Sequence, residues 1–342
     1  MSSAAIFEKL LNDFAARPVL TAPDNTLQRV MLELIQGGFT TLPLPGQGHT
    51  LDRWRALSAV AASDLALVKL FEGHTDALAI MKELEPGEPI ADGTWATWAA
   101  EPHFARVKII DRQADLVYMQ GRKAWCSGAP MLDQALMTAW DEHSRPQLVC
   151  VDLHQANIRR VEDAWQAVGM GSTASVDVEF EGAVGRCIGS PGQYLDRPGF
   201  WQGGGGIAAC WYGAACALAS YLREHCKQAH HDAHSAAHLG AVDAALCAAS
   251  ASLRETALWI DANPRRSAEI PVRRLRAQVE LAVNGVLEHV GRALGATPFC
   301  RNGHFARLAA DLPVFLRQSH AEKELAALGE LIAAQPVSGW SL

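Results

Sequence analysis

The chain has 342 residues, of which 49% are hydrophobic and 20% are charged, and its formal net charge is −7. This composition is typical of a globular protein and excludes a disordered or fibrous chain. Proteins that bind DNA or RNA present a basic face, so the acidic balance argues against nucleic acid as a partner. A chain of this length predicts about two or three domains.

The cysteines and the apolar runs indicate the compartment. Eight cysteines are spread through mostly apolar surroundings without a Cys-x-x-Cys pair, which predicts free thiols in a reducing cytoplasm. The first residues, up to Glu8 and Lys9, do not form a signal peptide. The longest apolar run, 206–222, is at the lower limit of a membrane span and predicts a core helix. We therefore expect a cytoplasmic protein with no membrane partner.

Residues 1–90 predict an N-terminal helical domain. Apolar residues recur at steps of three and four from Arg55 to Glu83, and two shorter stretches before them follow the same period. This pattern indicates about three helices. The Pro- and Gly-containing segment 85–89 ends the block.

Residues 91–190 predict a small antiparallel β-domain of sandwich or barrel type. Short, partly alternating apolar runs separated by turn residues are typical of strands. The predicted strands are 107–110, 116–119, 124–126, 135–137, 148–151 and 176–180.

Residues 191–342 predict a C-terminal four-helix bundle. Four segments have helix length and apolar periodicity: 207–225, 236–262, 272–293 and 304–328. Four glycines, 203–206, precede the first segment. They lack the Gly-x-Gly-x-x-Gly order of a dinucleotide site, so we expect them to let the domain junction turn tightly.

Three segments resemble the acyl-CoA dehydrogenase family. Trp98-Ala99-Ala100-Glu101-Pro102 resembles a strand end that reads aromatic-x-x-Thr-Glu-Pro, and Gly121-x-Lys123-x-Trp125-x-Ser127-Gly128-Ala129 resembles the flavin-facing strand. Residues 169–180 resemble the strand that closes the β-domain over the substrate cleft. The order of helical block, β-domain and bundle matches the family over nearly the whole chain. The resemblance implies an acyl-CoA dehydrogenase-like fold.

The resemblance also implies roles for particular residues. FAD is expected between the β-domain and the bundle, with Trp125 against the flavin ring and Ser127 supplying a hydroxyl. Trp98 and Ala100 are implied as further cofactor-binding positions. A homodimer or homotetramer is implied as well, because the family completes its flavin site with the neighbouring bundle. Without this context, a tryptophan on a strand is more often part of the core.

The same resemblance implies a substrate position at Met170 and Thr173, although these residues could equally pack a loop. By family frequency, the expected activity is that of an FAD-dependent oxidoreductase acting on acyl-CoA, another acyl thioester or a related small molecule. That reaction needs a carboxylate to remove the α-proton. Ser319 and the segment 200–202 stand at the two family positions for this carboxylate, and neither contains one. Two alternatives stay open: a flavin-dependent monooxygenase on the same fold, and a non-catalytic member that binds a ligand or a partner.

The C-terminal segment favours the monooxygenase alternative. Residues 301–320 resemble the end of the acyl-CoA-dehydrogenase-like flavin monooxygenases, which carry a helix with His and Arg there. Arg317 and His320 are three residues apart and are expected to share a helix face as catalytic residues. A histidine there can act as base or hydrogen-bond donor near neutral pH. A solvated helix terminus is the competing interpretation.

Five histidines lie between 225 and 238. His230, His234 and His238 are spaced at i, i+4 and i+8, so a continuous helix would align them on one side. No cysteine or carboxylate pattern completes a tetrahedral ligand set. We therefore predict no metal site.

Overall fold

The structure is a computed structural model that describes residues 2–17, 25–161, 165–228, 232–337 and 339–341. The chain separates into two compact units. Unit 1 consists of Met1–Val19, Pro43–Leu65 and Trp201–Leu342, and unit 2 consists of Leu20–Leu42 and Ala66–Phe200. The N-terminal helices divide between the two units, so the units do not follow the three ranges expected from the sequence.

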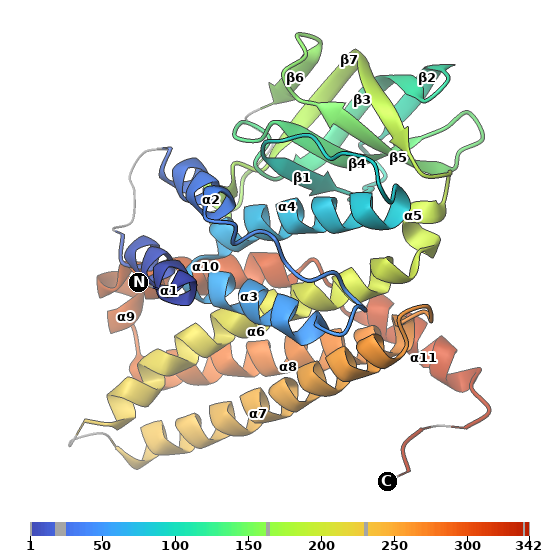
Figure 1. Cartoon of the computed structure of the whole chain (residues 1–342). Coiled ribbons are helices and arrows are strands. Elements are labelled where there is room, and N and C mark those ends of the chain that lie inside the picture. Colours follow the sequence, from blue (N-terminus) through green and yellow to red (C-terminus); the bar gives the residue numbers. More distant parts are fainter. Residues whose placement is uncertain (1, 18–24, 162–164, 229–231, 338, 342) are drawn as a thin grey trace. The chain divides into compact units, whose positions relative to one another are not determined.

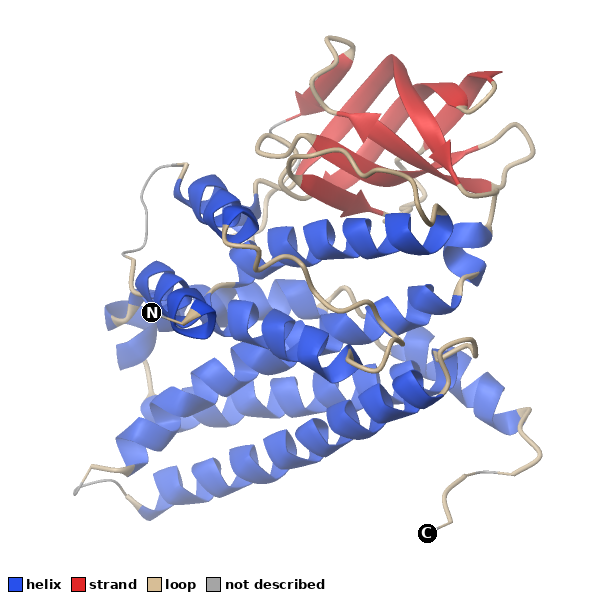
Figure 2. Cartoon of the chain, viewed as in Figure 1, coloured by secondary structure: helices blue, strands red, loops and turns tan. Residues whose placement is uncertain are grey.

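The described residues of unit 2 form a seven-stranded sheet (Figures 1 and 2). The strands are β1 (Trp95–Trp98), β2 (Val107–Gln113), β3 (Leu116–Cys126), β4 (Gln134–Trp140), β5 (Pro146–Asp152), β6 (Ile158–Val161) and β7 (Val176–Ile188). Their order is β1-β4-β2-β3-β7-β5, with β6 on β7, and β5 also pairs with β4. This last pairing closes the sheet into a barrel. Most pairs are antiparallel, whereas β4 runs parallel to β1 and β2.

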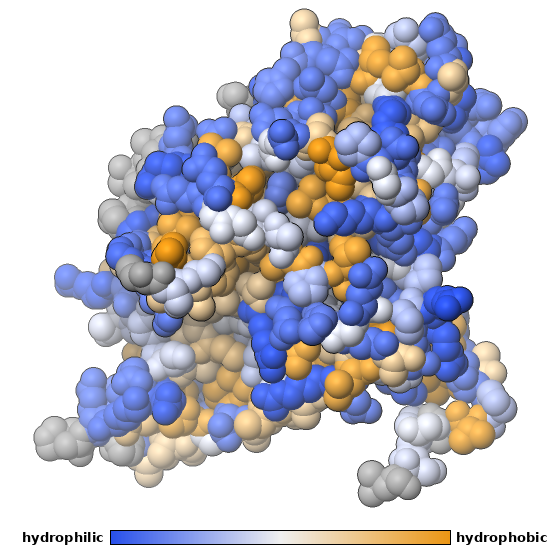
Figure 3. Space-filling model, in the orientation of Figure 1, coloured by the Kyte–Doolittle hydropathy of each residue, from blue (hydrophilic) through white to orange (hydrophobic). Residues whose placement is uncertain are grey.

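Each predicted strand lies within an observed one, and two short strands were missed. β3 joins two predicted strands, and Gly121 lies between them with φ 129°. A Cβ on Gly121 would lie 2.3 Å from the Arg106 carbonyl oxygen, so only glycine fits there. β6 contains Arg159 and Arg160 and lacks alternation, which explains why its sequence gave no strand signal. Figure 3 shows hydrophilic residues over much of the visible barrel surface, with apolar patches among them.

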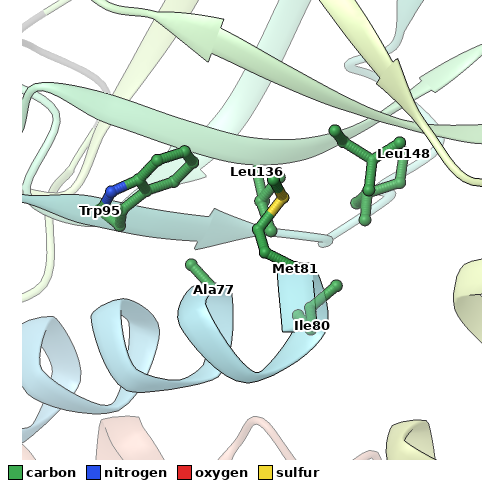
Figure 4. Close-up of a cluster of buried hydrophobic side chains, with 7 residues drawn as sticks. Ala77, Ile80, Met81, Trp95, Leu136 and Leu148 are labelled. Carbon is green, nitrogen blue, oxygen red and sulfur yellow. The ribbon is translucent and has the colours of Figure 1, made fainter. Parts of the chain in front are cut away.

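Helices α2 (Thr26–Gln36), α4 (Leu65–Leu84) and α5 (Gln193–Asp196) complete unit 2. One face of α4 packs against the barrel in a buried cluster (Figure 4). The cluster contains Ala77, Ile80 and Met81 from the helix, and Trp95, Leu136, Leu148 and Ile188 from the strands. Burial of this apolar surface fixes the helix to the sheet.

Unit 1 is helical throughout its described part. Its helices are α1 (Ser3–Ala15), α3 (Thr50–Ser63), α6 (Pro198–Cys226), α7 (Ala233–Ala262), α8 (Glu269–Leu294), α9 (Thr297–Arg301), α10 (Gly303–Leu316) and α11 (Glu322–Ala333). The last predicted helix is therefore interrupted between Leu316 and Glu322. The predicted helix 55–83 also breaks, at Asp64, whose backbone is extended with φ −169°. The Asp64 carboxylate is buried and pairs with Arg17 and Arg307.

The sequence predicted that the four glycines at 203–206 would turn the chain. They lie inside helix α6 instead. Gly205 and Gly206 allow α3 to approach α6 closely. A Cβ on Gly205 would lie 2.5 Å from Trp54 Cζ2, and one on Gly206 would lie 2.9 Å from Leu57 Cδ1. The same holds two turns later, where a Cβ on Gly213 would lie 2.1 Å from the Ser58 carbonyl oxygen.

Alanine substitutions in α6 are expected to have opposite effects at two positions. Gly213→Ala should destabilise the protein by about 1–3 kcal/mol, because the new methyl group meets backbone that must shift. Gly204→Ala should stabilise it by about 0.5–1 kcal/mol, because a Cβ there meets nothing within 4 Å and alanine favours the helix. Urea unfolding of both variants measures the difference. Equal stability of the two variants would contradict close packing at Gly213.

Among the described residues, α6 and α7 have the length and composition of a membrane-crossing helix. In α6, 67% of the apolar window is buried inside the protein, in agreement with the core helix predicted at 206–222. In α7 the corresponding share is 17%.

A buried acidic group lies on α4. The Lys69 ammonium donates to Glu72 Oε2 at 2.8 Å, and the Glu72 side chain is buried. Burial raises the pKa of Glu72 to about 7, Lys69 opposes this shift, and nearby Asp76 adds to it. The folded state therefore favours the protonated Glu72 carboxyl. The free energy of unfolding that this protonated group contributes is fully present below pH 4.5 and is lost as the pH rises through about 7.

Glu72→Gln is expected to flatten this pH dependence. The variant should match the wild type near pH 4.5 and exceed its stability at pH 8 by about 2 kcal/mol, because glutamine cannot ionise. Urea unfolding across this range tests the effect, with Glu33→Gln as the control, because the Glu33 side chain on α2 is 39% exposed. Parallel stability curves for wild type and Glu72→Gln would contradict it.

Candidate functional site

The end of β3 turns an indole ring outward. The β3–β7 ladder is irregular between Lys123 and Cys126, and Trp125 adopts φ 59°, a left-handed conformation that is unusual for a bulky residue. Its amide donates to Asp177 Oδ1 at 3.2 Å. Arg122 Nε donates to the other oxygen of Asp177 at 2.7 Å, so this carboxylate on β7 holds the bulge. The Trp125 side chain is 48% exposed.

Two more rings join Trp125 in an exposed aromatic patch. The Phe104 ring meets Trp125 edge-on, with centroids 5.8 Å apart, and is 63% exposed. The His103 ring meets Phe104 edge-on at 5.6 Å. We call His103, Phe104 and Trp125 the aromatic patch. Large exposed rings gathered in this way mark interaction sites on soluble proteins.

A chain of hydroxyl groups lies next to this strand end. Thr173 Oγ1 donates to the Met170 carbonyl oxygen at 2.6 Å, and its oxygen lies 2.7 Å from Ser175 Oγ. Ser175 Oγ lies 3.0 Å from Ser127 Oγ. Each hydroxyl has one hydrogen. Because the Thr173 hydroxyl donates its hydrogen to the Met170 carbonyl oxygen, Ser175 must donate to Thr173, and Ser127 must donate to Ser175. Ser127 is thus left with lone pairs that accept a hydrogen bond.

The structure brings most of the predicted cofactor and substrate residues together in unit 2. Trp98 is buried, and its indole nitrogen donates to the Ser127 carbonyl oxygen at 3.1 Å. Ala100 is exposed at the end of the same segment. Met170 and Thr173 are buried within the hydroxyl chain. The buried Trp98 therefore supports the backbone at Ser127, and Trp125 presents an exposed ring.

A buried ion pair supports the same strand. Lys123 is 1% exposed, and its ammonium donates to the carbonyl oxygen of Thr138 at 2.9 Å, to Thr138 Oγ1 at 2.7 Å, and to Glu101. Trp140 Nε1 donates to the second oxygen of Glu101 at 2.7 Å. Burial lowers the pKa of Lys123, and Glu101 opposes the shift. In the sequence, Lys123 and Glu101 were noted only as members of two motifs, and their pairing was not predicted. A lysine between apolar strand residues is the signal that a carboxylate partner is needed.

Arg317 and His320 lie in unit 1, apart from any continuous helix. Arg317 caps the end of α10 and pairs with Glu280 on α8. His320 follows in the break before α11, with its side chain 67% exposed and its Nδ1 3.6 Å from Glu324. The shared helix face expected from the sequence does not form, because α10 ends at Leu316.

The histidines do not assemble a metal site in the part of the chain that the structure describes. His238 Nδ1 lies 2.8 Å from His289 Nδ1, between α7 and α8. His230 lies outside the described residues. The alignment of His230 with His234 and His238 therefore stays a sequence pattern.

Comparisons with known proteins give structural matches alone. No family model and no curated protein match the sequence. The dibenzothiophene monooxygenase TdsC from Paenibacillus sp. A11-2, bound to FMN and indole, matches with a TM-score of 0.80 and 18% identity over 96% of each chain. The methanesulfinate monooxygenase MsuC from Pseudomonas fluorescens matches with a TM-score of 0.79 and 16% identity over 99% of each chain. The chain has the acyl-CoA dehydrogenase fold.

A third match supports the same architecture. The nitrososynthase from Micromonospora carbonacea var. africana has a TM-score of 0.78 and 15% identity, over 98% of this chain and 95% of that one. All three comparisons cover nearly the full length. The predicted order of helical region, β-domain and C-terminal helices is therefore confirmed.

Proposed function

We propose that this protein is a flavin-dependent monooxygenase and that the aromatic patch of unit 2 binds the flavin. The observation that carries the proposal is the exposed Trp125 ring, two residues before Ser127, whose hydroxyl keeps lone pairs that accept a hydrogen bond. A flavin is a flat aromatic system with polar edges, so it fits a ring surface flanked by a hydrogen-bonding group. TdsC and MsuC are named as monooxygenases, and TdsC binds FMN, which favours this reaction over oxidation of an acyl thioester.

The positions expected for a catalytic carboxylate agree with this choice. Ser319 is buried, and its hydroxyl accepts from the Ala321 amide at 3.3 Å. Gln202 is buried and donates to the Pro264 carbonyl oxygen at 3.0 Å. Neither side chain is a base. Oxygen insertion requires no removal of an α-proton, so a monooxygenase loses nothing by their replacement.

A bound reduced flavin supplies two electrons to O2, so that one oxygen atom enters the substrate and the other leaves as water. The chain's own residues would hold this group. Trp125 offers its ring face, and Ser127 accepts a hydrogen bond while Trp98 fixes its backbone. We propose FMN rather than the FAD expected from the sequence, because TdsC holds FMN. His320 is proposed to transfer a proton through its exposed imidazole, and Arg317, three residues earlier, pairs with Glu280.

Binding and labelling together test the function. The purified protein is titrated with FMN and with FAD, and the quenching of flavin fluorescence is measured. Photoreduced flavin, 18O2 and a probe substrate, either indole or dibenzothiophene, are then mixed with the protein. Incorporation of one 18O atom into the probe supports the proposal. Bleaching of the bound flavin by butyryl-CoA without oxygen would instead indicate a dehydrogenase, and failure to bind either flavin would indicate a non-catalytic member.

His320→Ala is expected to lower turnover of the oxygenated probe by about 10²-fold or more, because proton transfer by a positioned side chain contributes that much. The thermal midpoint should stay unchanged, since the side chain is exposed. His154→Ala is a matched control, because His154 is 65% exposed and also faces a carboxylate. Equal turnover of wild type and His320→Ala would leave His320 as a solvated residue at a helix terminus.

A further inference from the structure

A pocket of about 720 Å³ lies within unit 1, and none of its lining residues belongs to the proposed flavin site. Its walls come from the end of α1, from Tyr221 on α6, and from α9 with the start of α10. This volume is in the range of pockets that hold small organic ligands.

The charge of this pocket is positive. Among its lining residues, the charged side chains are Arg17 and Arg301, and no carboxylate joins them. Arg17 Nη2 is held by Asp64 at 2.6 Å, whereas the exposed Arg301 guanidinium makes no hydrogen bond or ion pair with another described residue. Arg307 donates to the carbonyl oxygens of Ala15, at 2.7 Å, and Arg17, at 3.0 Å, and is a third guanidinium behind this wall, although Asp64, 3.5 Å away, offsets part of its charge.

The remaining polar groups of the pocket are neutral. His304 Nε2 lies 2.9 Å from the Ala62 carbonyl oxygen, which only accepts, so this nitrogen carries a hydrogen. Burial lowers the pKa of His304, which favours the neutral ring; its Nδ1 lies 2.8 Å from Tyr221 Oη, and the Tyr221 hydroxyl also donates to Asn302 Oδ1 at 3.2 Å. The histidine therefore adds no positive charge, and the arginines set the preference for an anion.

An aromatic wall completes the pocket. Phe299 is 44% exposed, and its ring packs edge-on against Phe305 at 4.9 Å. Tyr221 packs edge-on against the same Phe305 ring at 5.3 Å. This packing fixes the two rings that line the pocket, and an exposed fixed ring is suited to stack on a flat ligand.

We propose that this pocket binds a small organic anion that carries a planar ring. Arg301 meets the anionic group, because a free guanidinium forms strong charge-assisted hydrogen bonds with phosphate or carboxylate. Phe299 meets the ring. The proposal does not depend on the flavin site, since the two sites share no residue.

Cys300 provides a reporter inside the pocket. It is exposed and lines the pocket, whereas Cys247 is exposed on α7 outside it. The full chain is alkylated with iodoacetamide, and the rates at both cysteines are followed by mass spectrometry. Phenyl phosphate at ten times its Kd is expected to slow alkylation of Cys300 by about tenfold and to leave Cys247 unchanged. Inorganic phosphate lacks the ring and phenol lacks the charge. Each should therefore need at least about a tenfold higher concentration than phenyl phosphate to slow the alkylation of Cys300 by the same factor.

Variants separate the two contacts. Arg301→Gln should remove most of the protection at the same phenyl phosphate concentration, and Phe299→Leu should weaken it, whereas Arg254→Gln on exposed α7 should not change it. The proposal is overturned if phenyl phosphate gives no protection up to about 10 mM, a concentration that already means very weak binding. It is also overturned if inorganic phosphate protects Cys300 as well as phenyl phosphate does. The same holds if phenyl phosphate protects Cys300 in the Arg301→Gln variant as well as in the wild type.

Discussion

Replacement of Trp125 by alanine is expected to weaken flavin binding by about 10- to 100-fold. Stacking of a flat heteroaromatic ring on a side-chain ring contributes roughly 1–3 kcal/mol, measured by alanine substitution. The Trp125 side chain is 48% exposed and held by the bulge at the end of β3, so its loss should leave the barrel intact. Flavin fluorescence titration gives the Kd, and far-ultraviolet circular dichroism reports the fold.

Two further variants make the Trp125 result specific. Trp340→Ala removes another highly exposed indole, near the C-terminus, and should leave the Kd unchanged. Trp125→Phe keeps a ring at the bulge and should recover much of the affinity. An unchanged Kd for Trp125→Ala would exclude the aromatic patch as the flavin site, even if the protein binds flavin elsewhere.

Glu101→Gln is expected to destabilise unit 2 by about 3 kcal/mol. Removal of one partner of a buried ion pair leaves an uncompensated charge, and this costs roughly 3–5 kcal/mol for a fully buried pair. Lys123 is 1% exposed and Glu101 is 22% exposed, so solvent reduces the penalty at the carboxylate. The Thr138 oxygens still accept from the ammonium and preserve part of its solvation. Urea unfolding measures the change.

A double variant distinguishes a lost charge partner from lost packing. Lys123→Met combined with Glu101→Gln should recover much of the stability, because no buried charge is then left unpaired. Glu142→Gln, at an exposed glutamate on the turn after β4, should have little effect. If Glu101→Gln unfolds at the wild-type urea concentration, the pair contributes no stability and Lys123 is solvated in another way.

Periodicity predicted the fold because most elements bury one regular face. Burial alternates at the start of β2, from Val107, and the buried residues of α8 recur mostly at steps of three and four. The breaks could not be predicted in the same way. At Asp64 the backbone leaves the helix, and the Asp64 carboxylate pairs with Arg17 and Arg307, which are both distant in the sequence. The glycines of α6 were predicted to form a turn, because glycine is common in turns. Their actual role, close packing against α3, depends on a partner helix that the local sequence does not reveal.

The candidate site was predicted in its members and less well in its geometry. A regular strand would place Trp125 and Ser127 on one side, because alternate side chains share a face, whereas a bulge held by Asp177 turns the indole outward. Trp98 has the same residue type as Trp125 but is buried at the end of β1. The hydroxyl partners of Ser127 could not be identified, because they lie about 50 residues further along the chain and meet it only through the β3–β7 pairing.

The hydrogen-bond chain from Met170 to Ser127 has a direction, and this direction has a chemical consequence. The Met170 carbonyl accepts at one end, so every hydroxyl along the chain is turned the same way and the last one offers only lone pairs. A ligand that presents an N–H at Ser127 is therefore favoured over the same ligand without that hydrogen. A buried loop that need not touch the ligand would thus select its protonation state, and Thr173→Val would remove this selection.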